Sequence, residues 1–397
     1  MTIHDGDRPL NAIRFLDADH GRTPVLALDL TVVATRYREL TEAIPDARVL
    51  YAMKANPHPA VVGLLAGLGC GIDVASTNEV DEAIAQGVPP ERISYGNTVR
   101  RASEISHAVE AGVRMFAVDD HDELDKLLEH APGSTVLARL NAEGTGAAWP
   151  LSRKFGTDVT SATEMLQRSR RAGHAVGATF HVGSQQSDPT SWDDALSQVA
   201  QVLDGISRTG DGPTADEPFV VNLGGGLPSR LADPTPALEH FSEEIHAAIA
   251  RHLAGAPISF AIEPGRFLVA DAGVIETEVI GIVQRPGQAC TRWVFVDVGV
   301  FQGLSEAAGE TIRYPLTTTV VGPTEPTVVA GPTCDSTDIL YERRPVQLPS
   351  ALTSGDRIRL HGTGAYTVGC STLGFNGFEP LRVEIANPDA ATSITPA

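Results

Sequence analysis

The sequence predicts an α/β fold, a (β/α)8 barrel with a separate all-β domain after it. From about residue 45, short apolar runs alternate with segments of helical periodicity, and eight such runs occur before the rhythm changes. Eight strand–helix units are the number that closes a barrel of this type. Beyond Arg266, strand-like runs follow one another without helical segments between them, a pattern typical of an all-β domain.

The barrel strands are predicted at the eight apolar runs, each bounded by polar or glycine-containing turns. Helical periodicity is clear between the first and second runs, from Val61 to Leu68, and again from Leu238 to Leu253. The predicted strands are Val49–Met53, Ile72–Ala75, Ile93–Tyr95, Met115–Val118, Val136–Leu140, Ala178–Val182, Phe219–Leu223 and Ile258–Ile262.

The domain boundaries follow from this change of rhythm. We expect the barrel over residues 30–270 and a β-sandwich or barrel-like domain over residues 271–397, which residues 1–29 join through a strand near Val25–Leu28. The strands expected in the second domain are Val274–Val283, Arg292–Val298, Thr317–Val321, Thr327–Val329, Asp356–Leu360 and Leu381–Ile385.

Composition excludes several classes of partner. The 397 residues carry a formal net charge of −20, which disfavours nucleic acids and anionic membranes and would attract a small cation. A generally acidic surface with no steering role is the better explanation of most of these charges. No apolar run is long enough to span a bilayer, and no signal-peptide pattern opens the chain, so a cytoplasmic protein is expected. Four cysteines without Cys-x-x-Cys spacing predict free thiols, and no histidine pair suggests a metal.

Polar residues follow the predicted barrel strands rather than preceding them. In a barrel, the loops after the strands build the active site, so such residues converge on one rim. The residues concerned are Lys54, Asp73, Arg139, His181, the glycines Gly224, Gly225 and Gly226, and Glu263.

Lys54 closes the apolar run that begins at Val49. Desolvation there would lower the pKa of the amine and make it a nucleophile able to attach a carbonyl cofactor such as pyridoxal phosphate. A solvated lysine at a strand end is the alternative. The context favours attachment, because Gly224–Gly226 offer backbone N–H groups to a phosphate, although a triple glycine alone is as often a flexible turn. Arg266 and Tyr366 could bind the same anion.

Three further residues suit such a cofactor. Glu263, in Glu-Pro-Gly265-Arg266, would keep a pyridine nitrogen protonated, unless it only pairs with Arg266. His181 could stack on a flat ring and Ser184 could bind the phosphate, although a histidine at a strand end is usually a packed residue. Cys334, in a polar turn with Asp335, is expected to act as an acid rather than as a buried structural thiol.

These motifs resemble one known family. The chain is similar, from Thr23 to about Ile385, to the fold-type III pyridoxal-phosphate decarboxylases of ornithine, lysine, arginine and diaminopimelate, whose barrel is related to that of alanine racemase. Cys-Asp looks like the ornithine/lysine branch, because the diaminopimelate branch typically has Cys-Glu there, and the stretches Val296–Glu306 and Cys334–Glu342 look most like bacterial ornithine decarboxylases. The resemblance rests on Tyr51–Asn56, Trp149–Gly156, His181–Ser184, Glu263–Arg266, Gly331–Asp335, Gly364–Tyr366 and Phe375–Phe378.

The resemblance implies a role for each matched residue. Lys54 would hold pyridoxal 5'-phosphate covalently, and Cys334 would return a proton to the substrate carbon after carbon dioxide leaves. Asp335 would bind the distal ammonium of the substrate from the second subunit of a homodimer whose sites lie at the interface. Asp73, Arg139, His181 and Glu263 would surround the ring and its lysine, and Ser184, Gly224–Gly226, Gly265, Arg266 and Tyr366 the phosphate.

The sequence also departs from the family pattern. Asn222 replaces an acidic residue before Leu-Gly-Gly-Gly, and Leu227 replaces an aromatic one after it. For contact with the substrate tail, the chain offers Glu306 and Glu310. The expected reaction is decarboxylation of L-ornithine to putrescine, with L-lysine or dual activity as the main alternative. A racemase is disfavoured because Cys334 stands where a tyrosine would be needed. A binding homologue without activity is disfavoured because Lys54 and Cys334 are both present.

Overall fold

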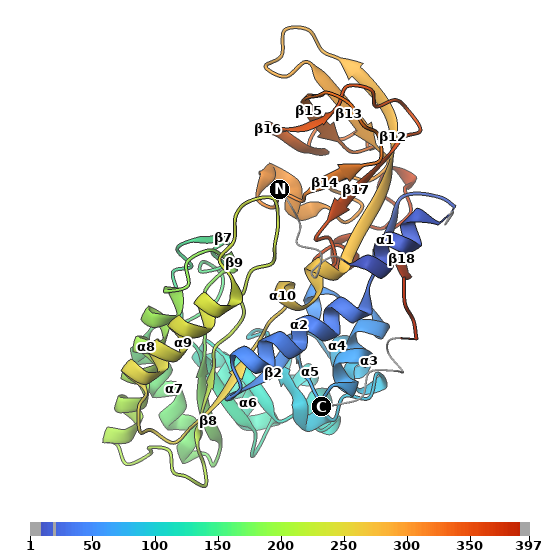
Figure 1. Cartoon of the computed structure of the whole chain (residues 1–397). Helices are drawn as coiled ribbons and strands as arrows, with labels where there is room; N and C mark the ends of the chain where they lie inside the picture. The colour runs from blue at the N-terminus through green and yellow to red at the C-terminus, as the bar shows by residue number, and fades with distance from the viewer. Residues whose placement is uncertain (1–8, 19–20, 390–397) are drawn as a thin grey trace.

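The computed structural model describes residues 9–18 and 21–389 and divides them into a barrel and a β domain. Figure 1 shows the barrel with its surrounding helices in the lower part of the view and the β domain above it. The predicted fold class is confirmed, since one sheet closes as an eight-stranded parallel barrel and the other is a separate mixed sheet.

The barrel strands pair in the order β10-β11-β2-β3-β4-β5-β6-β8 and close between β8 and β10. Every pairing is parallel, as a barrel built from strand–helix units requires. The strands are β2 (Ala47–Ala52), β3 (Gly71–Val74), β4 (Ile93–Tyr95), β5 (Met115–Val118), β6 (Thr135–Arg139), β8 (Ala175–Thr179), β10 (Phe219–Asn222) and β11 (Ile258–Ile262).

Eight helices form a continuous ring around the barrel, each packed against the next from α2 to α9 and α9 against α2. Each helix of the ring packs through an apolar face. In helix α8, for example, Trp192, Val199 and Ile206 recur at helical spacing on one face and are fully buried. The helices of the ring are α2 (Leu30–Ala43), α3 (Pro59–Gly67), α4 (Thr77–Ala85), α5 (Ala102–Glu110), α6 (His121–His130), α7 (Val159–Arg171), α8 (Ser191–Arg208) and α9 (Leu238–His252). Helices α1 (Leu10–Asp17) and α10 (Arg266–Val269) are not part of the ring.

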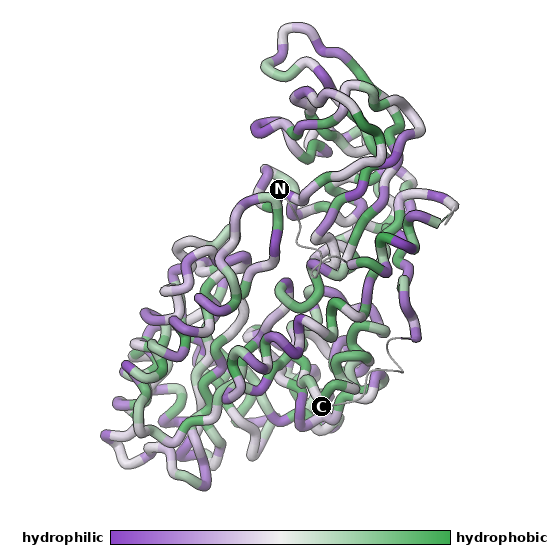
Figure 2. Tube along the Cα trace, in the orientation of Figure 1, coloured by the Kyte–Doolittle hydropathy of each residue, from purple (hydrophilic) through white to green (hydrophobic). Residues whose placement is uncertain are grey.

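Hydrophobic residues of the strands and the surrounding helices form one buried layer. Figure 2 shows such residues as green segments of the tube. Each fully buried Leu, Ile, Val or Phe side chain contributes about 1.5–3 kcal/mol to folding, so this layer holds the barrel rigid beneath its rim. The same cluster continues into the β domain through residues such as Ile275, Val279 and Leu360. The rim that carries the polar residues therefore stands on a continuous core.

The β domain is a mixed sheet centred on the long strand β12 (Gly273–Gln284), which pairs antiparallel with β1, β13 and β17. The predicted N-terminal strand is confirmed as β1 (Val25–Leu28), so the beginning and the end of the described chain meet in this sheet. The other strands are β13 (Arg292–Val296), β14 (Leu316–Thr318), β15 (Thr324–Ala330), β16 (Ile339–Pro349), β17 (Arg357–His361) and β18 (Arg382–Ile385).

Four features differ from the sequence-based prediction. Strand β8 lies earlier than predicted, because the apolar Phe180 and Val182 are buried in the loop after it rather than in the strand. Strand β16 was not predicted, because its charged middle, Glu342–Arg344, interrupts the apolar pattern. Helix α1 and the short hairpin of β7 (Ala147–Trp149) with β9 (Ser184–Gln186) were also not predicted.

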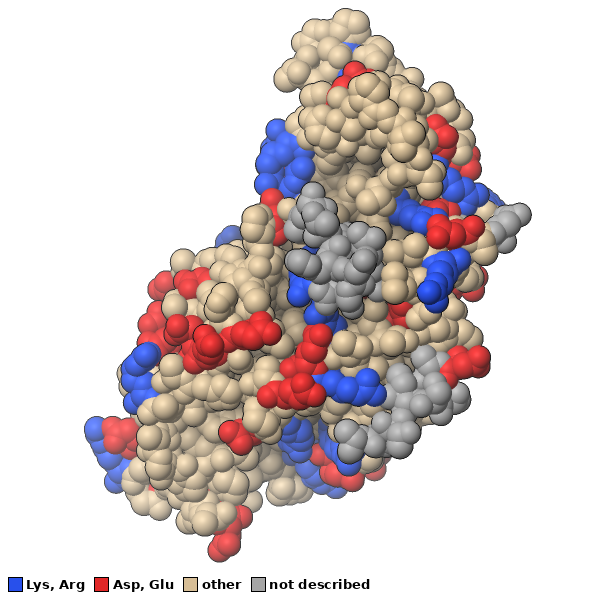
Figure 3. Space-filling model, in the orientation of Figure 1, with Lys and Arg blue, Asp and Glu red and all other residues tan. Residues whose placement is uncertain are grey.

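The face of the molecule in Figure 3 shows acidic side chains gathered over the region of α8 and α9, with basic ones scattered among them. This distribution agrees with the net charge of −20. Among the described residues, no helix has the length and apolar character needed to cross a membrane.

Candidate active site

The predicted rim residues do stand at the carboxyl ends of the barrel strands. Lys54 lies in a 3₁₀ turn, η2 (Met53–Ala55), directly after β2, and Arg139 is the last residue of β6. One pocket brings most of these residues together with groups from the β domain side. It is lined by Ala52, Lys54, His181, Ser184, Gly225, Gly226, Leu227, Glu263, Gly265, Arg266 and Tyr366.

Lys54 faces the carboxylate of Asp73 across 3.7 Å, from Nζ to Oδ2. Burial lowers the pKa of Lys54, but the neighbouring Asp73, Tyr366 and Glu263 raise it by more, so the net shift is upward. The sequence-based prediction of a pKa lowered by desolvation is therefore wrong for this structure. The reason is that strand pairing places Asp73 of β3 beside the end of β2, a juxtaposition that spacing along the chain does not reveal.

Asp73 is itself held in a buried, crowded position. Its pKa is raised well above the ordinary value, first because it is buried and then because Glu263 is close. One of its oxygens, Oδ1, is buried without a hydrogen-bond partner. Gly96 leaves room for this carboxyl group, because a Cβ there would overlap Oδ1. The pair thus places a buried carboxyl group beside the amine of Lys54, whose side chain is 49% exposed and lines the pocket.

His181 lies two residues beyond β8 and presents a neutral imidazole to the pocket. Its Nδ1 accepts a hydrogen bond from the backbone N–H of Gly183 at 3.0 Å, so the ring proton sits on Nε2. Burial and the nearby positive charges of Arg139 and Lys54 lower the pKa of His181 to about 3. An uncharged ring of this kind is suited to stacking rather than to acid catalysis.

We expect His181 to remain neutral, with its proton on Nε2, from pH 5 to pH 8. The pKa of His181 is near 6.5 in the unfolded chain and about 3 in the folded protein, so its contribution to stability is present above about pH 6.5 and is lost as the pH falls toward 3. The ¹⁵N chemical shifts of the imidazole, assigned with a His181→Gln variant, measure this directly. The protein denatured in urea provides the titrating control. A folded-state midpoint above pH 5 would contradict the structure.

The three glycines form a cradle where side chains do not fit. A Cβ at Gly224 would overlap the carbonyl oxygen of Phe180, and one at Gly225 would lie 2.7 Å from the carbonyl oxygen of Glu263 and 3.0 Å from His181 Nε2. Gly224 and Gly226 also have positive φ angles, of 65° and 128°. The prediction of a glycine-lined site between β10 and α9 thus has a steric basis. Backbone N–H groups here can approach an anion closely.

Arg266 adds a buried guanidinium beside this cradle. It opens α10 directly after Gly265, its Nη2 donates to Ser184 Oγ at 3.2 Å, and its charged group lies 4.9 Å above the ring of Tyr366. Arg266 Nε is buried without a hydrogen-bond partner. A buried N–H left unpaired is costly unless a ligand accepts from it. The side-chain-free cradle and this orphaned donor fit the phosphate of a cofactor such as pyridoxal phosphate.

Asn222 is a site residue whose function the sequence did not reveal. It was noted only as a departure from the family pattern, yet its Nδ2 donates to Glu263 Oε1 at 2.5 Å and its Oδ1 accepts from the backbone N–H of Gly224 at 3.0 Å. An amide at this position supplies a hydrogen-bond donor that an ionised aspartate would lack. Asn222 therefore orients Glu263 and the glycine cradle at the same time.

Arg139, at the end of β6, does not line the pocket and packs on an aromatic ring. Its guanidinium lies 4.8 Å from the ring centre of Phe155, which belongs to the Trp149–Gly156 motif. Burial lowers the pKa of Arg139, against the opposing effects of Glu263, Asp119 and Asp73.

Glu306 and Glu310 do not have the free carboxylates expected of substrate ligands. Glu306 pairs with both terminal nitrogens of Arg266, at 2.6 and 2.8 Å. Glu310 accepts from the backbone N–H groups of residues 342–344 and pairs with Arg313 at 2.9 Å, which lowers its pKa although burial opposes this. The expectation of substrate contact is thus not supported for Glu310, because its two oxygens anchor β16. Both carboxylate oxygens of Glu306 are bound to Arg266, so substrate contact is not supported for Glu306 either.

Cys334, which is exposed, and Asp335, which is half-buried, lie in a turn of the β domain, outside the pocket that holds Lys54. The backbone N–H of Cys334 donates to Asn376 Oδ1, and Asp335 accepts from the N–H and hydroxyl of Thr337, which lower its pKa. The buried Asp338 fixes the turn by accepting from Thr333. Within one chain, neither residue therefore lines the Lys54 pocket.

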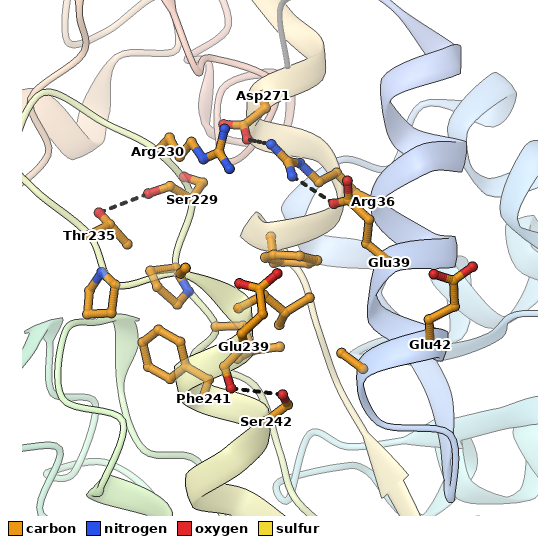
Figure 4. A pocket seen from close by; sticks show the side chains of 17 residues that line it. Arg36, Glu39, Glu42, Ser229, Arg230, Thr235, Glu239, Phe241, Ser242 and Asp271 are labelled. Atoms are coloured by element: carbon orange, nitrogen blue, oxygen red, sulfur yellow. Dashed lines mark hydrogen bonds and ion pairs between the residues drawn. The ribbon is translucent and has the colours of Figure 1, made fainter. Parts of the chain in front are cut away.

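A second, larger cavity lies between α2, the loop after β10 and the start of α9 (Figure 4). At one end, Arg36 donates to Glu39 at 2.7 Å and to Asp271 at 2.8 Å, so these charges pair with one another and tie α2 to the turn after α10. Glu239 and Phe241 of α9 form the opposite side. Of the residues predicted from the sequence to form the site, none lines this cavity. Within residues 9–18 and 21–389, no group of three or more His, Cys, Asp or Glu side chains is arranged to hold a metal.

The chain matches a family model and several known proteins. The family model for the pyridoxal binding domain of pyridoxal-dependent decarboxylases matches residues 30–270. A lysine/ornithine decarboxylase of Selenomonas ruminantium is 33% identical over 377 residues, which cover 94% of this chain and 92% of that relative. Antizyme inhibitor 2 of Xenopus laevis is 29% identical over 385 residues, covering 93% of this chain and 82% of its own.

The fold is shared with solved structures over nearly its whole length. The crystal structure of a lysine/ornithine decarboxylase from Vibrio vulnificus complexed with putrescine has a TM-score of 0.84 and 30% sequence identity, covering 95% of this chain and 98% of that one.

Proposed function

This chain belongs to the pyridoxal-dependent decarboxylases, and from that premise we propose that it converts L-ornithine to putrescine and carbon dioxide. It is a decarboxylase of the lysine, ornithine and arginine type, with pyridoxal phosphate as its cofactor. One observation supports the proposed chemistry most strongly. A lysine paired with a buried carboxylate faces a pocket that also contains a glycine cradle and an arginine with an unpaired N–H.

Each pocket residue has a role in this proposal. Lys54 attaches the cofactor, and Gly224–Gly226, Ser184, Arg266 and Tyr366 bind its phosphate. The cofactor ring supplies an electron sink for the Cα–carboxylate bond of the substrate. Glu263, which accepts a hydrogen bond from Asn222 and lines the pocket, would keep the ring nitrogen protonated. His181, being neutral, stacks without adding charge.

We extend the proposal to a homodimer with composite sites. Cys334 is exposed, Asp335 is half-buried, and both lie outside the Lys54 pocket of their own chain, which leaves them available to the pocket of a second subunit. In such a site, Cys334 returns a proton to the substrate carbon and Asp335 pairs with the distal ammonium. A two-fold interface provides two identical sites per dimer.

Cys334→Ala should retain the cofactor while turnover falls by roughly 10²-fold, because a positioned acid contributes about that much. Protonation should also become misdirected, so that part of the product is an aldehyde and the substrate nitrogen stays on the cofactor. Product analysis by chromatography measures both effects. Cys290→Ala, on a half-buried thiol elsewhere in the β domain, is the matched control. Unchanged turnover with only amine as product would show that the thiol of Cys334 is structural.

The substrate is tested by competition among L-ornithine, L-lysine, L-arginine and diaminopimelate in one reaction. The name of the Selenomonas relative favours lysine or dual activity as the second candidate. One methylene changes discrimination by only about 1–3 kcal/mol, so both diamines are expected, with putrescine in excess. An excess of cadaverine, the product from lysine, would show that lysine rather than ornithine is the preferred substrate. Cofactor binding without turnover of any of the four would favour a binding protein, the class that the similarity to antizyme inhibitor 2 suggests.

A further inference from the structure

We propose that Glu306 is a positioning residue that fixes the guanidinium of Arg266 for the cofactor phosphate. This inference rests on the role of Arg266 as a phosphate ligand within the proposed function. It replaces the expected contact between Glu306 and the substrate.

The geometry of the pair is that of a clamp. Glu306 Oε2 accepts from Arg266 Nη1 at 2.8 Å and Oε1 from Nη2 at 2.6 Å, so both terminal nitrogens are held in one plane. The side chains are 2% exposed for Arg266 and 13% for Glu306. Glu306 comes from the 3₁₀ segment η5 (Ser305–Glu310) of the β domain, whereas Arg266 opens α10 after the last barrel strand. The clamp therefore joins the two domains at the pocket.

The remaining contacts of Arg266 show what the clamp achieves. Its Nη2 also donates to Ser184 Oγ, and Tyr366 covers the face of the guanidinium. With these groups in place, the N–H of Nε is buried and has no partner in the protein. Arg266 lines the pocket together with Gly225 and Gly226, so its guanidinium and the glycine cradle border the same space, although a small shift is needed for the buried Nε to reach an anion there. A guanidinium free to rotate would not keep that donor in place.

Glu306 could affect an anionic ligand in two opposite ways. Its negative charge repels a phosphate and partly neutralises Arg266, which would weaken binding. Its bidentate geometry orients Arg266, which would strengthen binding. The structure favours orientation, because removing Glu306 leaves a buried arginine without its main partner, and such a group moves or draws in water. The two effects predict opposite changes in cofactor affinity, so the sign of the change decides between them.

The test is a titration of each cofactor-free protein with pyridoxal phosphate, followed by absorbance and fluorescence. We expect Glu306→Ala to bind it about tenfold more weakly or worse, equivalent to about 1.4 kcal/mol. Glu306→Asp, which keeps the charge and the acceptors, should recover part of the affinity. At saturating cofactor, most of the wild-type kcat should return in Glu306→Ala, because the defect lies in binding.

Glu276→Ala is the matched control. Glu276 is also a buried carboxylate clamped by arginines, Arg357 and Arg359, but it lies on β12 and does not line the pocket. Its loss should lower the thermal midpoint without changing cofactor affinity. Unchanged or tighter binding by Glu306→Ala, or an equal weakening by Glu276→Ala, would overturn the inference. A wild-type protein that binds the cofactor but decarboxylates nothing would refute the proposed reaction only, since the affinities of the variants still test Glu306.

Discussion

Replacing Lys54 with alanine is expected to lower kcat/KM by at least about 10³-fold and to abolish covalent attachment of pyridoxal phosphate. The physical reason is that Lys54 is the pocket amine, held 3.7 Å from Asp73 on the rim between β2 and β3. The measurement is reduction of the protein with borohydride, followed by peptide mass spectrometry to locate the modified residue. In the wild type, the label should lie on Lys54.

The sequence makes this experiment unusually clear, because the chain contains only three lysines, Lys54, Lys126 and Lys154. Lys126 is bound to Glu123 and to the carbonyl oxygen of Arg100, away from the pocket. Lys154 packs on the ring of Phe155, which also contacts Arg139, and is therefore the matched control. Lys154→Ala should keep the label on Lys54. A label on Lys154 in the wild type, or a Lys54→Ala variant with normal turnover, would contradict the assignment of Lys54.

Mixing the Lys54→Ala and Cys334→Ala variants should restore activity that neither has alone. If Cys334 completes the site of the other subunit, random exchange gives half heterodimers, each with one intact site and one doubly altered site. The ceiling is then about a quarter of wild-type activity, by the symmetry of a two-fold interface. Activity is followed during subunit exchange, and native mass spectrometry reports the fraction of heterodimer.

A double variant carrying both changes in one chain is the control for this experiment. Mixed with wild type, it should form heterodimers whose two sites each lack one of the two groups, so activity should fall below the average of the separate proteins. Mixed single variants that exchange subunits but stay inactive would place Lys54 and Cys334 in the same subunit's site. They would also refute the composite dimer.

Much of the barrel could be predicted because its strands are buried on both faces. Such strands appear as continuous apolar runs, and all eight predicted runs overlap an observed barrel strand. Only the run at Ala178–Val182 was displaced, since loop residues beside the pocket are as apolar as the strand itself. In the β domain, β16 was missed because a strand whose middle is exposed carries charges there, and these hide the alternation.

The site was predictable to the extent that chemistry depends on residue type and on position after a strand. Lysine, glycine and arginine motifs identified the residues that line the pocket, because parallel barrel strands bring their carboxyl ends to one rim. What a side chain contacts across that rim could not be predicted in the same way. Asn222 meets Glu263 from the neighbouring strand, and Glu306 meets Arg266 from another domain, 40 positions away.

The sequence by itself therefore determined the fold class, the cofactor-binding motifs and the reaction family, because periodicity and residue chemistry are local properties. Only the tertiary structure decided the charge of Lys54, the neutral state of His181 and the partners of Glu306 and Glu310. These depend on which groups strand pairing and domain packing bring within a few ångströms, where burial and Coulomb interactions are strong enough to shift a pKa or hold a guanidinium in place.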